Sequence, residues 1–311
     1  MIVVDNASTD GTVAAVGTAH PAATVIETGA NHGFSAACNQ GVRAASGELV
    51  CFLNPDAVPQ PGWREAIAAP AASGEWDAWQ ALVTAQGGRV VNTRGGVVHF
   101  TGIAWAGGAG EAVGAAPPDP AAQPGFVSGA CLAIGRERFL AAGGFPDDFF
   151  LYHEDVDLSL RLRLEGGRLG VATGARVDHS YEFEKGHAKW RYLERNRWAT
   201  LIRTYPAALL AVLAPALAAT ELALIPISIA GGWFGQKLLA AADLVRRLPG
   251  LLGERRTIQA RRSVSAREFA DALRPELDSP FLGATGRSRL VRALLAGYWR
   301  VALGILGLGG R

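Results

Sequence analysis

Short apolar runs alternate with longer amphipathic stretches along residues 1–60, and Gly or Pro marks most of the junctions. This alternation is typical of α/β proteins, in which helices connect the strands of a parallel sheet. Ligands of such sheets bind at the carboxyl ends of the strands. The apolar runs predict strands at Ile2–Val4, Thr24–Thr28 and Leu49–Leu53, and the stretches between them predict helices from Thr12 and over Ser35–Ala45.

The pattern is weaker in the next part of the chain. Residues 70–125 are rich in Gly, Ala and Pro, with short strand-like pieces at Ala78–Thr84 and Val97–Ile103. The segment 106–125 is typical of a flexible loop, and we consider it a candidate lid. Beyond it, the pattern predicts a strand at Phe126–Ile134 and a helix at Arg136–Ala142.

A further helix is predicted after an acidic and aromatic stretch. Val156, Leu160 and Leu164 recur at helical spacing, which predicts a buried helix. Arg161 and Arg163 should lie on its more exposed side. The acidic residues that come just before Val156 would then stand at the N-terminus of this helix.

The pattern changes after His179. Trp190–Tyr205 is typical of a basic, aromatic helix, and the stretch Ala207–Gly235 contains Glu221 as its only ionisable residue. About 20 apolar residues suffice to span a membrane, but Glu221 and two prolines interrupt this stretch, and the arginines that follow favour the cytoplasmic side. We therefore expect a re-entrant hairpin or a pair of interfacial helices, with Leu290–Leu308 as a further interfacial helix. The alternative is an Ala-rich helical subdomain packed on the first part of the chain.

Length and composition fit a globular protein. The chain has 311 residues, 49% of them hydrophobic, which is enough for one large domain or for a catalytic domain with an appendage. Its 3 cysteines follow no metal-binding spacing, which favours a reducing cytosol over a disulfide framework. No secretory signal peptide is recognisable. The chain opens directly on an apparent buried strand, so we expect its start to fall inside the fold.

Charge divides the chain into two unlike parts. Up to residue 180 there are 10 basic and 18 acidic residues, a net charge of −8, and after it there are 20 and 10, a net charge of +10. The acidic first part disfavours a nucleic acid as the partner. The basic second part suits an anionic membrane surface.

Two polar residues follow the third predicted strand. Asn54 and Asp56, in LNPDA, would lie at the carboxyl end of the sheet, where oxygen ligands suit a hard divalent ion that keeps positions for phosphate oxygens. Asn-Pro-Asp is also an ordinary turn. His179 follows the apparent strand Arg176–Asp178 and could supply an imidazole to the same ion, although a lone histidine is more often a packed or surface residue.

Three acids stand close together in the segment HEDVDL. Glu154, Asp155 and Asp157 follow the aromatic run Phe149–Tyr152. Acids at a helix N-terminus complement its dipole, at about 0.3 to 1 kcal/mol each, and this explains one or two of them. The aromatic run indicates a catalytic role for one of the acids. Apolar neighbours raise the pKa of a carboxyl group and favour a proton acceptor whose pKa is closer to neutrality. We expect one acid to be a general base and Asp157 to position the helix.

Five ordered segments resemble family 2 glycosyltransferases, most closely the rhamnosyltransferase-like branch. The resemblance extends over residues 1–205, and the order of five motifs is more specific than any one of them. The segments are VVDNASTDGT (3–12), NHGFSAACNQG (31–41), LNPDA (53–57), SGACLAIGRERFLAAGGFPDDFFLYHEDVDLSLR (128–161) and VDHS (177–180).

The resemblance implies an α/β fold of the GT-A type, with a mostly parallel sheet, in residues 1–205. It also implies a dTDP- or UDP-linked nucleotide-diphospho-sugar donor, a divalent metal ion, Mn²⁺ or Mg²⁺, and inversion at the anomeric carbon. Residues 206–311 lie outside the resemblance, and we expect them to form a helical, apolar and basic region associated with the membrane.

The resemblance also implies roles for single residues. Asp155 matches the catalytic base and Glu154 its acidic neighbour, while Asp56 and His179 match the metal ligands. The positions that match the donor-nucleotide site are Asp5, Asn6, Asn31, Gly33, Asn39, Asn54 and Asp56.

The leading hypothesis is an inverting, metal-dependent transferase that adds one sugar, with rhamnose as a candidate, to a lipid-linked or cell-envelope glycan on the cytoplasmic face of a bacterial membrane. Single addition is favoured because ERNRW, at 194–198, differs from the Gln-x-x-Arg-Trp signature of processive synthases. The alternative is a non-catalytic, truncated nucleotide-sugar-binding or scaffold protein at the membrane. A dinucleotide oxidoreductase is disfavoured, because no G-x-G-x-x-G follows a predicted strand.

Overall fold

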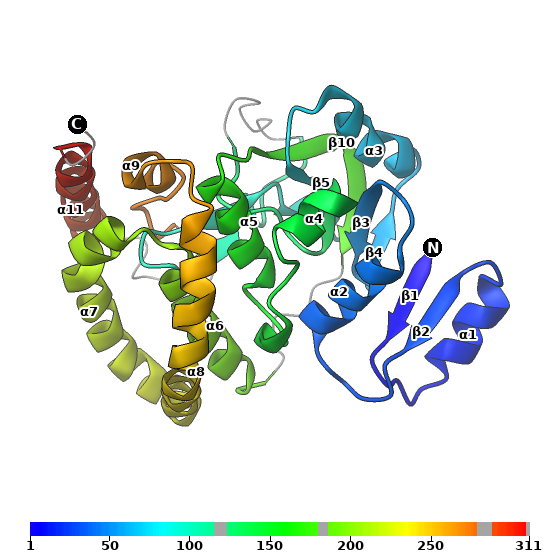
Figure 1. Cartoon of the computed structure of the whole chain (residues 1–311), viewed down its shortest axis with the longest axis horizontal. Helices are drawn as coiled ribbons and strands as arrows, with labels where there is room; N and C mark the ends of the chain where they lie inside the picture. Colours follow the sequence, from blue (N-terminus) through cyan, green and yellow to red (C-terminus); the bar gives the residue numbers. More distant parts are fainter. Residues whose placement is uncertain (115–122, 180–185, 279–287, 309–311) are drawn as a thin grey trace.

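A six-stranded sheet lies at the centre of the protein. The computed structural model of the chain describes residues 1–114, 123–179, 186–278 and 288–308. The strands of the sheet are β3 (Leu49–Leu53), β4 (Ala57–Pro59), β5 (Ala78–Ala85), β6 (Val90–Thr93), β9 (Cys131–Gly135) and β10 (Leu169–His179). Their order is β3-β9-β5-β10-β4, and β6 pairs with β5 outside this path (Figure 1).

The predicted α/β class is confirmed, but the central sheet is mixed rather than mostly parallel. β5 and β10 run parallel, whereas β9 is antiparallel to both β3 and β5, and β4 is antiparallel to β10. A parallel pair needs a long crossover connection, usually a helix. The alternation of helix and strand seen in residues 1–60 does not continue between β5 and β9, where short strands and loops connect the sheet.

The first two predicted strands form a parallel pair of their own. β1 (Ile2–Asp5) and β2 (Thr24–Glu27) are joined by α1 (Thr12–Ala19), and the pair lies to one side of the central sheet (Figure 1). Within the described residues, neither strand is hydrogen-bonded to the central sheet. α2 (Phe34–Ala44) packs on β1 and leads into β3. This unit is therefore attached to the rest of the fold mainly through α2.

Helices cover both faces of the central sheet. On one face, α4 (Arg136–Ala141) and α5 (Glu154–Leu164) pack with α2 around an apolar core that includes Phe52 and Phe139. On the other face, α3 (Trp63–Ser73) closes a second core. The predicted apolar side of α5 is confirmed, since its leucines are fully buried.

The polar side of α5 differs from the prediction. Arg161, expected on the exposed side, is only 3% exposed. Its guanidinium donates to Asp157 Oδ1 at 2.6 Å and to Gly144 O at 2.6 Å, and Arg203 Nε lies 3.1 Å from the other Asp157 oxygen. A buried charge persists where it is paired and hydrogen-bonded, which helical spacing alone does not reveal. Asp157 thus positions α5, as predicted.

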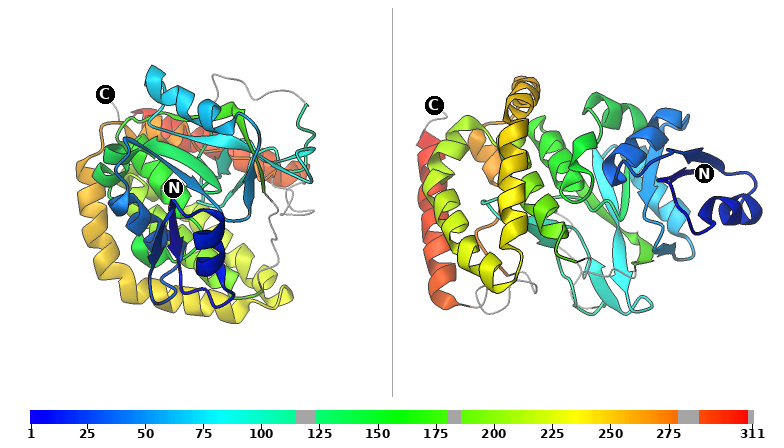
Figure 2. Two further views of the ribbon diagram at one scale, coloured as in Figure 1. Left: turned by 90° about the vertical axis from the view of Figure 1, so that its right-hand side faces the viewer. Right: turned by 90° about the horizontal axis from the view of Figure 1, so that it is seen from below.

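The C-terminal helices form a bundle beside α5 (Figures 1 and 2). The remaining elements are β7 (Gly96–Val98), β8 (Ala104–Ala106), α6 (Lys189–Thr204), α7 (Ala207–Ala230), α8 (Phe234–Ala260), α9 (Ala266–Ala270) and α11 (Arg289–Leu308). One apolar cluster joins Phe100 and Leu160 of the first part of the chain to Leu209 and Trp299 of the bundle. The core therefore continues across residue 205, where we predicted a domain boundary.

The nearly uncharged stretch forms one continuous helix, α7, instead of a re-entrant hairpin, whereas the pair of interfacial helices stays a prediction. α7 passes through Pro215 and Pro226, and α8 follows after a short turn and packs along α6. Glu221 of α7 pairs with Arg197 of α6 and accepts from Lys237 Nζ of α8 at 2.6 Å. This ion-pair network fastens α7 to α6 and α8, which agrees with the alternative of a helical subdomain packed on the first part.

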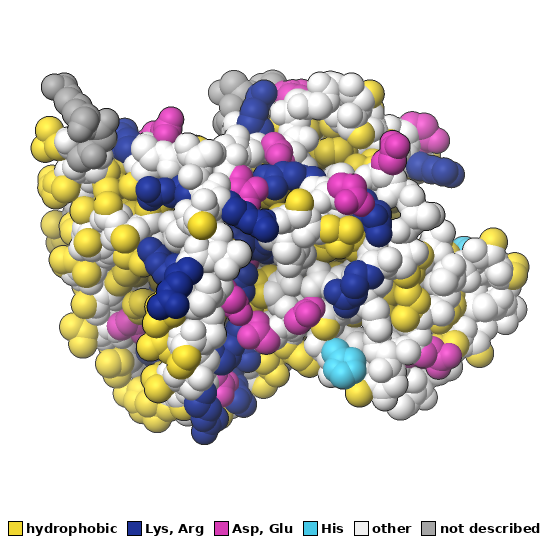
Figure 3. Space-filling view, in the orientation of Figure 1, with side chains coloured by type: hydrophobic (Ala, Val, Ile, Leu, Met, Phe, Trp, Pro, Cys, Tyr) yellow, Lys and Arg dark blue, Asp and Glu magenta, His cyan; other side chains and the backbone are white. Residues whose placement is uncertain are grey.

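Much of the apolar surface of the bundle faces solvent. α7 and α11 are each long and apolar enough to cross a membrane, by length and composition only. In Figure 3, hydrophobic side chains cover the edge where α7 and α11 lie, and basic side chains gather along α8. Large exposed apolar patches mark contacts with a membrane or a protein. The exposed residues are Leu222, Ile225, Ile227 and Ile229 of α7 and Leu290, Leu294, Val301, Ile305 and Leu308 of α11.

Candidate active site

Four of the predicted donor residues meet at the carboxyl end of β1. Asp5 is buried there and accepts the Ser8 amide at 3.0 Å. The Asn6 side chain donates to Gly33 O at 3.0 Å, and Asn31 Oδ1 accepts the Gly33 amide at 3.0 Å. The two asparagines hold the loop before α2 against the end of β1. The structure thus brings Asp5, Asn6, Asn31 and Gly33 to one edge.

Gly33 joins this loop to the segment that carries the acids. Its φ is +86°, and a Cβ at this position would lie 2.5 Å from Phe150 O. The amide of Phe34 donates to the same carbonyl at 2.6 Å. Because only glycine combines this conformation with so close an approach, Gly33 fixes the contact between the loop at the carboxyl end of β1 and the segment that carries Glu154 and Asp155.

A second group of predicted residues lies where β3 and β10 end. Asp56 Oδ1 is 2.9 Å from His179 Nε2, and Asn54 Nδ2 is 3.5 Å from the same ring nitrogen. The Asp56 side chain is 46% exposed, whereas that of His179 is 4% exposed. β4 pairs with the end of β10, with Ala57 opposite His179. This pairing explains why residues so far apart in sequence meet.

These side chains fit a divalent ion that takes its other ligands from a substrate. Asn54 Oδ1 is buried with no hydrogen-bond partner among the described residues, beside the Asp56 carboxylate and the His179 ring. Carboxylate and amide oxygens suit Mg²⁺ and Mn²⁺, and the imidazole suits transition metals. Among the residues that the structure describes, no group of three or more His, Cys, Asp or Glu side chains is placed to hold a metal. A divalent ion held by these side chains would take its remaining ligands from a substrate.

Glu154 and Asp155 begin α5, where Glu154 is buried and Asp155 is half-buried. Burial, followed by the Asp155 charge, raises the pKa of Glu154 to about 8. Burial raises the pKa of Asp155 to about 6, although its carboxylate accepts the amides of Gly129 at 2.9 Å and Val156 at 2.8 Å. Near neutral pH the pair therefore keeps one proton, on Glu154, and Asp155 is the ionised member.

The segment 128–130 connects the acid pair to the group at Asp56. Gly129 N donates to Asp155, and Ala130 O accepts the amide of Asn54 at 3.1 Å. We predicted a strand from Phe126, but β9 begins at Cys131. The residues before it are irregular because the backbone amides of Val127, Ser128 and Gly129 donate to the side chains of Ser159, Gln80 and Asp155 instead of to a neighbouring strand.

The loop before α5 is strained. Phe150, Tyr152 and His153 have φ values of 64°, 70° and 68°. Residues with side chains avoid this left-handed region, and such strain persists only where the surroundings impose it. The Phe150 ring stacks on Tyr192 of α6, with the ring centroids 5.2 Å apart. The strained backbone turns the chain so that Glu154 and Asp155 start α5.

Asn196 of α6 holds this loop in place. Its Nδ2 lies 3.0, 2.9 and 2.8 Å from the carbonyl oxygens of Phe149, Leu151 and Tyr152. Arg195 Nη2 also donates to Phe149 O, at 2.8 Å. We did not predict these residues. The signal available in the sequence was the polar ERNRW segment inside a predicted helix. The structure shows that Asn196 in this segment is completely buried.

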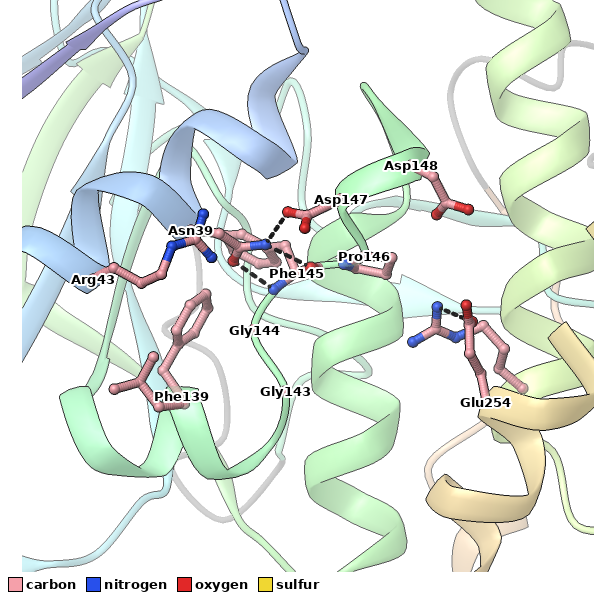
Figure 4. Close-up of a pocket in the computed structure, with 12 residues that line it drawn as sticks. Asn39, Arg43, Phe139, Gly143, Gly144, Phe145, Pro146, Asp147, Asp148 and Glu254 are labelled. Carbon is pink, nitrogen blue, oxygen red and sulfur yellow. Dashed lines mark hydrogen bonds and ion pairs between the residues drawn. The ribbon is translucent and has the colours of Figure 1, made fainter. Parts of the chain in front are cut away.

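Asn39 lies apart from the other predicted donor residues. Its amide donates to Phe145 O at 2.7 Å and to Asp147 Oδ1 at 2.6 Å, and its Oδ1 accepts the Phe145 amide at 2.9 Å (Figure 4). These bonds assign Asn39 to positioning the 143–148 loop, whose Asp147–Phe149 part is a 3₁₀ turn. The same loop lines a cavity of about 510 Å³ whose lining residues do not include the acid pair or the group at Asp56.

Solved structures with the same fold are glycosyltransferases of the GT-A type. A structure of GalNAc-T7 with UDP, GalNAc and Mn²⁺ superposes with a TM-score of 0.54 at 15% identity, over 68% of this chain and 43% of that chain. Staphylococcus aureus TarS with UDP-GlcNAc gives a TM-score of 0.52 at 14% identity, over 99% of this chain and 82% of the other. At these identities the likeness shows the fold alone.

Sequence comparison identifies the family. Residues 1–103 match the family described as Glycosyl transferase family 2. The N-acetylglucosaminyl-diphospho-decaprenol L-rhamnosyltransferase of Mycobacterium tuberculosis is 30% identical over 227 residues, which are 65% of this chain and 73% of that protein. The O-antigen biosynthesis protein RfbC of Myxococcus xanthus is 32% identical over 152 residues, 45% of this chain and 12% of that protein. The chain belongs to glycosyltransferase family 2, in the rhamnosyltransferase-like branch.

Proposed function

We propose that the protein transfers a single sugar, with L-rhamnose as the first candidate, from a nucleotide-diphospho-sugar to a lipid-linked glycan. The observation that carries this proposal is Asp155, the ionised member of the acid pair, which stands near the carboxyl end of β1 because Gly33 and Phe34 contact Phe150 of the loop before α5. The mycobacterial relative is named for transfer of rhamnose to a decaprenol-linked N-acetylglucosamine. Its name supports both the sugar and the class of acceptor.

In the proposed reaction, Asp155 accepts the proton of the acceptor hydroxyl as that oxygen attacks the anomeric carbon of the donor. The attack comes from the face opposite the diphosphate, so the bond to the diphosphate oxygen breaks with its electron pair and the configuration inverts. A positioned base contributes about 10² to 10⁴ in rate. Protonated Glu154 adds no negative charge, which keeps the pKa of Asp155 from rising further.

The donor diphosphate would lie between the β1 edge and the group at Asp56. Asp56 and His179 would hold a divalent ion there, with Asn54 Oδ1 as a third ligand. The ion, when bound, acts as a Lewis acid towards the leaving diphosphate. Asp56 is exposed enough to meet a ligand, while the buried His179 fixes the geometry of the pair.

We also propose that the enzyme works at the cytoplasmic face of a membrane. The exposed apolar faces of α7 and α11 support this location, and so does the net charge of +10 after residue 180. A lipid-linked acceptor would then reach the acid pair from the membrane side.

The direct test is a transfer assay with dTDP-rhamnose and an N-acetylglucosaminyl-diphospho-polyprenol, with and without Mn²⁺, and with UDP-sugars as alternative donors. We expect transfer from one donor class, and an inverted anomeric configuration by NMR. Calorimetry with dTDP and UDP, each with and without Mn²⁺, separates donor binding from transfer. Metal-dependent binding without transfer would overturn the acceptor class. Absence of binding to both nucleotides would favour the non-catalytic alternative.

A further inference from the structure

A second cavity lies away from the acid pair, where α7 begins against the end of α8. Its volume is about 320 Å³, and its lining residues are Ala207, Arg255, Arg256, Gln259 and Arg262. We call it the α7–α8 pocket. No acidic residue is among these lining residues, so the described wall of the pocket carries only positive charge.

Two of the polar residues are fixed by the end of α6. Arg255 donates to Tyr205 O at 2.7 Å, and Gln259 Nε2 donates to Thr204 O at 2.9 Å. Arg256 and Arg262 have exposed side chains at the mouth of the pocket. Burial and the Arg262 charge lower the pKa of Arg255. The arginines therefore repel one another, and a bound anion would relieve this repulsion.

The backbone adds donors at the same place. α7 is a helix of 24 residues that begins at Ala207 without a side-chain N-cap, and the amides in the first turn of a helix have no partner within the helix. Guanidinium groups bind phosphate oxygens in a bidentate manner. The chemistry of the pocket thus favours a phosphate group.

The pocket continues an apolar face. Leu238, Val245, Leu252 and Arg256 follow one another at spacings of seven, seven and four residues, which places them on one side of α8. All three apolar residues are exposed, at 43% or more. Ala207 is likewise the first exposed residue of α7. A phosphate in the pocket would therefore sit at the edge of a surface suited to acyl chains.

We propose that the α7–α8 pocket binds the phosphate of an anionic phospholipid headgroup while the apolar face rests on the bilayer. This assignment extends the proposed membrane location and needs no sugar transfer. An anionic lipid fits better than an acidic protein, because the basic pocket lies at the end of the exposed apolar row Leu238, Val245 and Leu252 of α8. The site would set the orientation of the bundle on the membrane.

The test is flotation of the full chain with vesicles of phosphatidylcholine alone or mixed with phosphatidylglycerol. We expect binding to the mixed vesicles, a loss of about 5-fold for Arg256→Gln and of about 30-fold for Arg256→Gln with Arg262→Gln. Arg246→Gln is the matched control, because Arg246 lies on α8 with a 79% exposed side chain, outside the pocket. Its loss should stay below about 2-fold, since the pocket is intact.

Equal losses for Arg246→Gln and Arg256→Gln would show diffuse attraction and overturn the pocket assignment. Inorganic phosphate is the second probe. If it raises the melting temperature of the wild type while Arg256→Gln floats as well as the wild type, the pocket binds a soluble phosphate and the lipid assignment is overturned. Unchanged circular dichroism of each variant excludes unfolding as the cause. Because flotation does not depend on catalysis, a failed transfer assay leaves this result intact.

Discussion

The two polar groups of the candidate site differ in how much of the protein supports them. Asp56 is half exposed and meets His179 at the ends of two strands, and its neighbour Asn54 has an oxygen with no partner among the described residues. Glu154, which is buried, and Asp155, which is half-buried, follow a strained loop that α6 holds in place. The first group keeps an exposed carboxylate and an amide oxygen with which a ligand could interact. In the second group, the burial that comes with packing already raises the pKa values of Glu154 and Asp155.

The comparison predicts that Asp155→Asn has the largest effect. The amide cannot accept the acceptor proton, so we expect kcat to fall by about 10² to 10⁴, with dTDP or UDP affinity unchanged. Transfer kinetics and calorimetry on the same sample check this. Asp148→Asn serves as the control, because Asp148 lies in the neighbouring loop and pairs with Arg247 rather than with the site. Turnover close to that of the wild type would contradict the assignment of Asp155.

Asp56→Asn should act on the other group. Loss of the carboxylate weakens a metal ligand, and we expect Mn²⁺-dependent nucleotide affinity to fall on the order of 10- to 100-fold, while metal-independent affinity stays the same. Titration with and without Mn²⁺ gives both values. Glu65→Gln is the control, because Glu65 is an exposed acid in α3 and its substitution also removes one negative charge. An unchanged metal dependence in Asp56→Asn would remove this group from the metal site.

Asn196→Ala tests whether α6 positions the acid pair. Three carbonyl oxygens lose a shared donor, so we expect a destabilisation of about 1 to 3 kcal/mol and a fall in kcat of about 10-fold. The distinguishing readout is the acid limb of the kcat/KM profile, which reports the ionisation of the base. It should lie near pH 6 in the wild type, where Asp155 gains its proton, and move in the variant.

A purely structural role for Asn196 would lower the melting temperature and leave that limb in place. Arg191→Ala is a suitable control, because Arg191 is on the same helix and pairs with Asp243 of α8 at 2.6 Å, away from the loop. If both variants lose activity equally without a shift of the profile, the positioning role is wrong.

The sequence predicted the elements that depend on local patterns. The strands at β1, β2 and β3, the helix α2 and the apolar side of α5 lie within one or two residues of their predicted places. It also named residues that the fold brings together, such as Asp56 with His179 and Asn31 with Gly33. The turn-forming residues at strand ends mark these positions in the sequence. The order of the family motifs indicates that Asp56 and His179, which are far apart in sequence, belong to one site.

What the sequence did not predict depends on distant partners. The antiparallel pairing of β9 with β5 depends on how the loops connect the strands. The burial of Arg161 depends on its hydrogen bonds to Asp157 and Gly144. The hydrogen bonds of Asn196 join residues more than forty positions apart in sequence. The lid predicted at 106–125 falls partly on residues 115–122, which lie outside the described residues.

Glu154→Gln gives the smallest expected effect and acts on stability. The pKa of Glu154 is about 8 in the folded protein against an ordinary value of 4.5. Between these values the folded state keeps a proton that the unfolded state has lost, so this residue makes folding less favourable as pH rises. Glutamine does not ionise and removes that dependence. We expect a gain in the free energy of unfolding that is absent near pH 4.5 and increases towards pH 8. Urea unfolding of both proteins across this range measures it, and a difference that does not vary with pH would contradict the buried, protonated state of Glu154.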